Sequence, residues 1–219
     1  MRATPTFFSL LLCCSAAACT PTDLNMTTAS HAPEAATYRV NPAPTQGYRI
    51  RMTIKDAPGP FAWKKALAQY DVVNRECLSP PRDNPGGRSA PVPTEDVEIA
   101  LKQISENEYE AFLYADYMQD EDYTGRGVCH WKLIQFRVHM KATGADGETL
   151  FIPAIPDEKL IPLETEVVYF NKISYPRLAS SELEEPLDTG ESNRARFGPA
   201  IHDSDLFTVT FEPAKGTER

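Results

Sequence analysis

Hydrophobic and polar residues alternate with a period of two through most of the chain after residue 47. In residues 48–55, Tyr48, Ile50, Met52 and Ile54 alternate with charged or polar residues. Successive side chains of a β-strand point to opposite faces, so this alternation predicts a strand with one buried face. Comparable patterns predict strands at residues 97–102, 109–115, 128–143, 149–155, 166–174 and 206–212, and residues 66–74 form a further strand or the start of a short helix.

The longest predicted strand, residues 128–143, changes phase near its middle. Cys129 and Leu133 lie on one face, whereas Phe136 and Met140 continue the apolar series one position out of step. One extra residue in a strand displaces the alternation in this way, so we expect a β-bulge at residues 134–135.

These patterns amount to about eight strands with little helix, and most of the 19 prolines lie between the strands. They indicate an all-β fold, either an antiparallel β-sandwich or a partly closed barrel. We expect a single domain over residues 47–214, with a long loop near 178–204 and a tail at 215–219. The immunoglobulin pattern does not fit, because Trp63 and Trp131 both lie outside the interval from Cys77 to Cys129.

The first 19 residues have a different organisation: Arg2, a short apolar stretch at 7–12, and a run of small residues that ends at Cys19. This order of regions is typical of a secretory signal peptide, and the cysteine after small residues resembles the lipobox of bacterial lipoproteins. The resemblance implies that residues 1–18 are removed and that Cys19 is acylated. Residues 19–46 would then form a flexible tether. An ordinary signal peptide cut near Ala18, or a cytosolic protein with an apolar start, are the alternatives.

The same resemblance implies a location. Thr20 follows the cysteine, and in the enterobacterial sorting rule a residue other than Asp at this position favours the outer membrane. The apolar stretch at 7–12 is far shorter than the roughly 20 residues that span a bilayer, so the expected membrane attachment is lipid. The folded domain would face the periplasm or the outside.

The charge balance of the chain is acidic, with 31 Asp and Glu against 22 Lys and Arg and a formal net charge of −9. Removal of Arg2 with the signal peptide would make it more acidic. Proteins that bind nucleic acid carry a basic patch or stripe, so nucleic acid is not an expected partner. A basic protein partner is compatible with this balance.

Cysteine use fits an oxidising compartment. Cys13 and Cys14 would leave with the signal peptide and Cys19 would carry lipid, so only Cys77 and Cys129 remain. We expect these two to form a disulfide in the periplasm. Two free buried thiols are the alternative, and a catalytic thiol is disfavoured because no histidine with an orienting Asn or Asp accompanies either cysteine.

In the segment 116–131, four carboxylates lie within seven residues: Asp116, Asp120, Glu121 and Asp122. An EF-hand calcium loop that started at Asp120 would need an acid at its twelfth position, where Trp131 stands. These acids therefore predict a solvated loop between strands, which is a plausible contact for a basic partner. Trp63 follows an apolar loop and either caps one end of the sandwich or serves as an exposed anchor for a partner.

Motifs for catalysis are absent from the sequence: it contains no nucleophile elbow, no zincin motif and no glycine-rich dinucleotide loop. His130 and His139 lack a third zinc ligand. No catalytic residue, metal or cofactor is therefore expected, although a hydrolase with a dispersed pair of carboxylates stays open.

Three segments carry a family resemblance: 70–74 with 77–81, 116–123, and 125–131. Together they resemble a group of small lipoproteins of Gram-negative bacteria, some of which are similar to immunity proteins against antibacterial toxins delivered by type VI or type IV secretion. Phospholipases are among such toxins. The resemblance covers residues 48–175 and implies a protein that binds and neutralises a toxin with no chemistry of its own. An envelope protein that binds a small ligand, or a structural lipoprotein, remains the alternative.

The lipobox resemblance gives a first testable prediction. Mass spectrometry of the membrane fraction should find an amino-terminal Cys19 that carries two or three acyl chains. Cys19→Ala should release the protein from the membrane after a high-salt wash, because no other lipid attachment is expected. A Cys19→Ala protein that stays membrane-bound would contradict the lipoprotein interpretation.

Overall fold

The computed structural model describes residues 37–80, 91–178 and 185–217, which belong to one compact unit. The expected signal peptide, the acylated Cys19 and most of the expected tether lie outside the described residues. Within the described residues the chain forms eleven strands and a few short helical turns. No helix there is long and apolar enough to cross a membrane.

One sheet contains five antiparallel strands. Their order across the sheet is β4, β5, β1, β11 and β9. The bounds are Leu101–Gln103 for β4, Glu108–Tyr114 for β5, Gly47–Lys55 for β1, Leu206–Lys215 for β11 and Glu166–Asn171 for β9.

The second sheet has the order β10, β7, β6, β2 and β3, and β8 also pairs with β6. All its pairs are antiparallel except that of β10 with β7. The bounds are Leu187–Asp188 for β10, Leu150–Phe151 for β7, Trp131–Lys141 for β6, Trp63–Val72 for β2, Thr94–Ile99 for β3 and Ala154–Pro156 for β8.

The helical elements are single turns. They are α1 (Asp157–Leu160), η1 (Arg75–Cys77), η2 (Lys172–Ser174), η3 (Arg194–Phe197) and η4 (Asp203–Asp205). The last two, with β10, lie in the predicted long loop 178–204 or at its end.

These sheets confirm the predicted all-β sandwich, and the strand order shows no closed barrel in the described part of the chain. The predicted strand at 97–102 is two strands, because the chain leaves β3 at Ala100 and enters β4 in the other sheet. Such a strand that changes sheets makes a corner of the sandwich. The predicted strand at 149–155 is likewise two short strands, β7 and β8, and β10 is the remaining addition to the eight expected.

Two finer predictions are also confirmed. Residues 66–72 are strand, as part of β2, not the start of a helix. In the pairing of β2 with β6, Gln69 faces Gln135 while the next residue, Tyr70, faces Leu133. Ile134 is thus the extra residue of a β-bulge, at the place where the apolar series changed phase.

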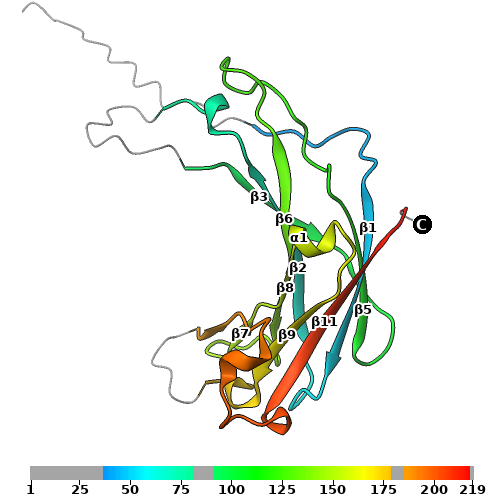
Figure 1. Cartoon of the computed structure of the whole chain (residues 1–219), viewed down its shortest axis with the longest axis vertical. Helices are drawn as coiled ribbons and strands as arrows, with labels where there is room; N and C mark the ends of the chain where they lie inside the picture. The colour runs from blue at the N-terminus through cyan, green and yellow to red at the C-terminus, as the bar shows by residue number, and fades with distance from the viewer. Residues whose placement is uncertain (1–36, 81–90, 179–184, 218–219) are drawn as a thin grey trace, which may run out of the picture. The chain divides into compact units, whose positions relative to one another are not determined.

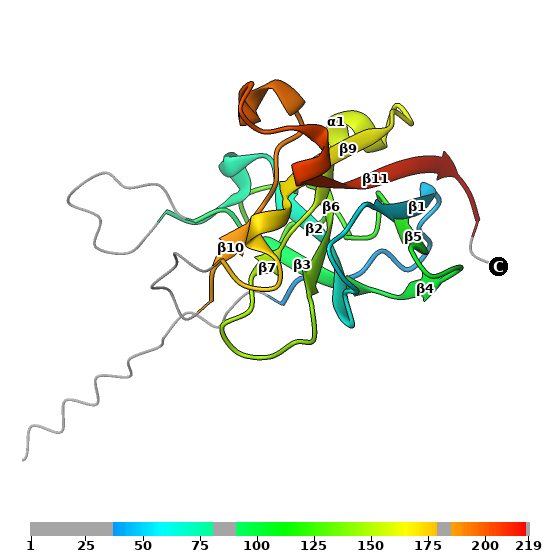
Figure 2. The ribbon, with the colours of Figure 1, turned by 90° about the horizontal axis from the view of Figure 1, so that it is seen from below.

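The core lies between the two sheets (Figures 1 and 2). Seen from below in Figure 2, β1, β4 and β5 lie to one side and β3, β7 and β10 to the other. The inward residues of β1 are those predicted from alternation, with exposed fractions of 4% or less. Aromatic rings fill the middle of the layer: Phe170 stacks on Phe207, and Phe151 meets both edge-on.

The strands place several chain segments together at one end of the sandwich. β1 starts there, β5 ends there and β6 starts there, so the connection 115–130 and the segment 37–46 meet at this end (Figure 1). We call it the loop end. The opposite end carries the hairpin between β4 and β5 and the turn that leads into β2.

The predicted disulfide between Cys77 and Cys129 is present. It joins η1 to the residues just before β6, and both sulfur-bearing residues are buried beside Val72. The bond therefore fixes the loop end to the second sheet.

We predict that Cys77→Ser with Cys129→Ser lowers the free energy of unfolding by about 4 kcal/mol, since the bond closes a loop of 52 residues. Urea unfolding of the oxidised protein and of the double variant measures the difference. Wild-type protein unfolded in a reducing agent is the matched control and should behave like the variant. Equal stability of oxidised wild type and variant would contradict the assigned role.

Candidate binding site at the loop end of the sandwich

The connection from β5 to β6, residues 115–130, is long for a loop between strands, and loops of this length are commonly functional. Its backbone is nevertheless held in place. Glu121 and Cys129 form an isolated antiparallel bridge in which the Cys129 N–H donates to the Glu121 carbonyl at 2.9 Å. The disulfide then connects the same residue to η1.

Asp122 organises the tip of this connection. Its carboxylate accepts hydrogen bonds from the backbone N–H groups of residues 124–127 at 2.7–3.2 Å. Gly125 and Gly127 have φ values of 75° and 106°, which a side chain would disfavour. Loss of hydration alone would raise the pKa of Asp122, but these backbone hydrogen bonds lower it below the ordinary value.

Asp120 and Glu121 also have partners within the domain. One carboxylate oxygen of Asp120 accepts the backbone N–H of Trp131 at 2.8 Å, and the other lies 2.7 Å from Nδ1 of His130. Glu121 forms an ion pair with Arg39 through two guanidinium nitrogens. The acids that the sequence predicted to form a solvated loop between strands are hydrogen-bond acceptors that order this loop.

Asp116 holds the segment that precedes β1. Its carboxylate accepts the N–H groups of Thr45 and Gln46, both at 2.9 Å, and the Thr45 hydroxyl at 3.1 Å. Burial alone would raise the pKa of Asp116, but these hydrogen bonds lower it. Asn41 donates its side-chain amide to the Asp116 carbonyl at 2.8 Å.

Residues 37–46 were assigned to the flexible tether, and here the structure differs from the prediction. Val40 forms a bridge with Met118, and the Tyr38 ring contacts the rings of Trp131 and Tyr123 at centroid distances of 4.9 and 5.1 Å. The domain therefore begins near residue 37 instead of 47. The reason is physical: backbone pairing and ring contacts to residues 78 to 93 positions away outweigh a local composition rich in Thr, Ala and Pro.

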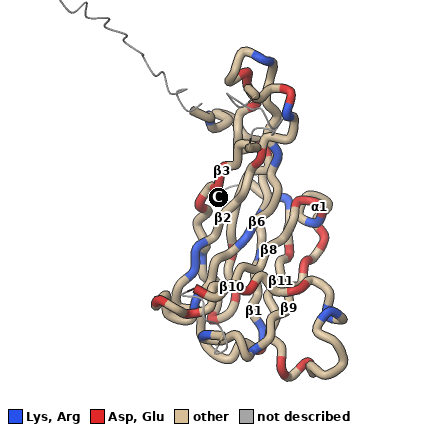
Figure 3. The backbone as a smooth tube through the Cα atoms, turned by 90° about the vertical axis from the view of Figure 1, so that its left-hand side faces the viewer, with Lys and Arg blue, Asp and Glu red and all other residues tan. Residues whose placement is uncertain are grey.

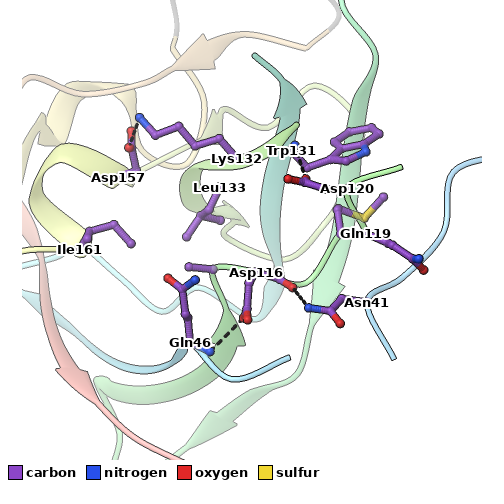
Figure 4. A pocket seen from close by; sticks show the side chains of 12 residues that line it. Asn41, Gln46, Asp116, Gln119, Asp120, Trp131, Lys132, Leu133, Asp157 and Ile161 are labelled. Atoms are coloured by element: carbon purple, nitrogen blue, oxygen red, sulfur yellow. Dashed lines mark hydrogen bonds and ion pairs between the residues drawn. The ribbon is translucent and has the colours of Figure 1, made fainter. Parts of the chain in front are cut away.

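A cleft of about 530 Å³ opens between these segments and the start of β6. Its lining combines apolar and polar side chains, which surround one space (Figure 4). The apolar lining residues are Ala115, Met118, Trp131, Leu133 and Ile161, and the polar ones are Asn41, Gln46, Asp116, Gln119, Asp120, Lys132 and Asp157.

One wall of the cleft is an ion pair between the sheet and α1. Asp157 begins α1, is largely buried, and lies 2.5 Å from Nζ of Lys132 on β6. The hydrogen bond to Asp157 raises the pKa of Lys132 above its ordinary value. Sequence reasoning missed this pair because its members are 25 positions apart, and the only local signal was a lysine inside an apolar strand.

Trp63 does not belong to this site. It starts β2 at the opposite end, where it is 38% exposed and packs closely against Gly144. The last residue of β2, Val72, pairs with Trp131 beside the cleft, and nine residues of strand separate the two ends by about 30 Å. The structure therefore brings Asp116 and Asp120 together in the cleft, leaves Glu121 and Asp122 beside it, and places Trp63 elsewhere.

Trp131 has one further feature: its indole N–H is buried and has no hydrogen-bond partner among the described residues. An unsatisfied donor of this kind costs about 1–3 kcal/mol. Within the same residues, no group of three or more His, Cys, Asp or Glu side chains could hold a metal ion.

The fold and site define the described part of the chain as a disulfide-bonded β-sandwich domain with an ordered acidic loop beside an open cleft. Comparison with known proteins adds nothing to this class: no family model, no curated protein and no solved structure matches the chain.

We predict that Asp116→Ala lowers the free energy of unfolding by about 1–3 kcal/mol at pH 7, because a charged acceptor for three donors is lost. Glu164→Ala is the control, since Glu164 is exposed and its carboxylate has no described partner. The pKa of Asp116 is lowered on folding, so its contribution is complete above the ordinary value of 3.8 and disappears as pH falls through the folded value. Urea unfolding at pH 7 and near pH 2 tests this, and a pH-independent difference would contradict it.

Proposed function

We propose that this protein is an envelope lipoprotein that binds and neutralises a secreted antibacterial protein toxin, and that the loop end of the sandwich is its binding surface. The observation that carries the proposal is the set of internal bonds that hold that end in place. A disulfide, two isolated bridges and the hydrogen bonds of four carboxylates fix it. A surface that is already ordered loses little conformational entropy on binding, which favours tight inhibition.

The position at which the domain begins also supports the loop end as the binding surface. Tyr38 contacts Trp131 at the loop end, so the chain enters the described domain beside the cleft. Eighteen residues separate Cys19 from residue 37, and they can extend to about 60 Å at most. A lipid at Cys19 would hold the binding surface within that distance of the bilayer, where it would meet a membrane-attacking toxin at a raised effective concentration.

Charge favours a basic partner. Hydrogen bonds that lower the pKa of Asp116 and Asp122 keep these carboxylates negative at neutral pH. Acidic residues at the loop end are interspersed with Lys and Arg, so the surface is mixed (Figure 3). The formal net charge of −9 therefore acts mainly by steering encounter, while the cleft and its rim provide contact.

The cleft itself favours a second candidate function. Its volume of about 530 Å³ falls within the range of small-molecule sites, roughly 300–1,000 Å³, and its lining combines apolar and polar side chains. An envelope protein that binds a small ligand would use the same site. Native mass spectrometry of the purified protein distinguishes this function by a bound small molecule.

The proposal predicts protection. Cells that express the full chain should survive a secreted toxin that kills sibling cells without it, and the two proteins should co-purify. The association rate should fall at least tenfold between about 50 and 500 mM salt, with little change in dissociation, because charge steers the encounter. Failure to protect, together with a bound small molecule, would favour the second function instead.

A further inference from the structure

One edge of the sandwich is open in the part of the chain that the structure describes. Of the strands that end the two sheets, β4 has three residues and β10 has two, so neither offers a long edge. The outer side of β9 is partly covered, because Tyr169 exchanges two backbone hydrogen bonds with Glu191. The six residues of β3 have β2 on one side and no described partner strand on the other.

The pairing of β3 with β2 shows which backbone groups face the open side. The Val72 N–H of β2 donates to the Pro93 carbonyl, just before β3, at 3.1 Å, and the same register continues along β3. Hydrogen-bonded pairs alternate along an antiparallel ladder. The residues of β3 that bond to β2 are therefore Glu95, Val97 and Ile99. The residues whose backbone N–H and C=O groups point away from β2, and make no hydrogen bond within the described residues, are Thr94, Asp96 and Glu98.

Unpaired N–H and C=O groups along an edge are a template for a further strand, but the side chains of β3 disfavour a second copy of the same edge. In a two-fold antiparallel pair centred on Asp96, this residue lies opposite its own copy. A register centred on residue 97 places Asp96 opposite Glu98, and one centred on residue 95 places Glu95 opposite Glu95. Like charges directly opposite each other destabilise an antiparallel pair, so β3 disfavours pairing with itself.

The same acids favour a basic strand. Asp96 contacts Arg137 of β6 at 2.5 Å, and its side chain is 42% exposed. Glu98 contacts Lys65 of β2 at 3.1 Å, and its side chain is 67% exposed. Ion pairs as exposed as these are weak. Each carboxylate can therefore accept a second cation from the open side of β3.

We propose that the open edge of β3 pairs with an extended basic segment of the partner protein, which adds a strand to the second sheet. The segment runs antiparallel to β3, its backbone bonds to the open N–H and C=O groups, and its Lys or Arg side chains lie beside Asp96 and Glu98. In strand addition of this kind, main-chain hydrogen bonds supply affinity and alternate side chains supply specificity.

This inference rests on the proposed function, because the basic segment belongs to the toxin. The edge also adjoins the proposed binding surface. Thr94 begins β3 opposite Asp71, and the next residue of β2, Val72, pairs with Trp131 at the loop end. A strand added to β3 therefore continues the surface of the loop end along the side of the sandwich.

A short peptide tests the edge without the toxin. The probe is acetyl-Lys-Val-Lys-Val-Thr-amide, which in antiparallel register places its lysines opposite Glu98 and Asp96 and its threonine opposite Thr94. NMR spectra of the isotope-labelled protein should show saturable shifts of the amide protons of these three residues in the millimolar range, because their N–H groups gain acceptors. The absence of saturable shifts at these amides would contradict the proposal.

Two control peptides separate backbone pairing from charge. The first carries a methyl group on the backbone nitrogen of its central lysine, which keeps both charges but removes one donor. It should bind at least about fivefold more weakly, since a hydrogen bond is lost. The second has glutamate in place of both lysines and should not bind, because its carboxylates would lie opposite those of β3. Binding of either control as tight as that of the parent peptide would overturn the proposal.

Proline on the open side of β3 tests the same contact in the protein. Glu98→Pro removes an N–H that points away from β2, whereas Glu98→Ala removes the same carboxylate and keeps the N–H. Edge strands tolerate proline where its nitrogen faces solvent, so the variant should fold. Glu98→Pro should weaken the parent peptide at least about fivefold relative to Glu98→Ala. If urea unfolding shows that Glu98→Pro is destabilised, Thr94→Pro with Thr94→Ala makes the same comparison at the first residue of β3.

The same variants, in the full chain, separate this inference from the proposed function. If Glu98→Ala protects cells from the toxin and folded Glu98→Pro does not, both stand. If both variants protect and bind the toxin equally, the toxin is neutralised elsewhere and the β3 inference is wrong. If the peptide binds β3 but wild type neither protects nor binds the toxin, the proposed function fails and β3 pairs with a basic segment of another protein. A dimer that Glu98→Pro abolishes would instead assign the edge to a second copy of this chain.

Discussion

One layer of aromatic and aliphatic side chains, buried between the two sheets, is the interaction on which the rest of this structure depends. Phe170 and Phe207 stack at a centroid distance of 5.0 Å, and Phe151 from the facing sheet meets both rings edge-on at 5.5 Å. In the middle of β6 and β11, Phe136 meets Phe211 in the same edge-on way. Rings of this size remove large apolar areas from water and pack only in a few relative orientations, so they fix the separation and the mutual position of the sheets.

The geometry of the loop end follows from those fixed sheets. β5 and β6 lie in different sheets, so residues 115–130 must cross the end of the sandwich, outside the paired strands of both sheets. Backbone N–H groups that are buried or that lie in turns still need hydrogen-bond acceptors. Asp122 is the acceptor for residues 124–127 of the connection, Asp116 is the acceptor for Thr45 and Gln46 before β1, and Asp120 accepts the backbone N–H of Trp131 at the start of β6. The acidic residues of this segment therefore have a structural role, whatever their part in function.

Local patterns in the sequence were enough to predict much of the fold. The alternation in β1 and the phase change at Ile134 are visible in the sequence because side-chain direction depends only on the position along a strand. The disulfide followed from the number of cysteines that remain after Cys19. Contacts between distant segments could not be predicted in this way. The packing of Tyr38 on Trp131 and the pairing of Lys132 with Asp157 depend on which strands become neighbours, and no local pattern records that.

The acids of the loop end order the backbone and also remain negatively charged. A carboxylate that accepts backbone hydrogen bonds keeps its charge, because those bonds favour the ionised form and lower the pKa. Asp157 is neutralised by Lys132, so the charge of the cleft is set by Asp116 and Asp120, whose donors are backbone N–H groups, the Thr45 hydroxyl and His130. Folding itself positions most of these donors, so the ionised state of Asp116 is favoured by the folded domain.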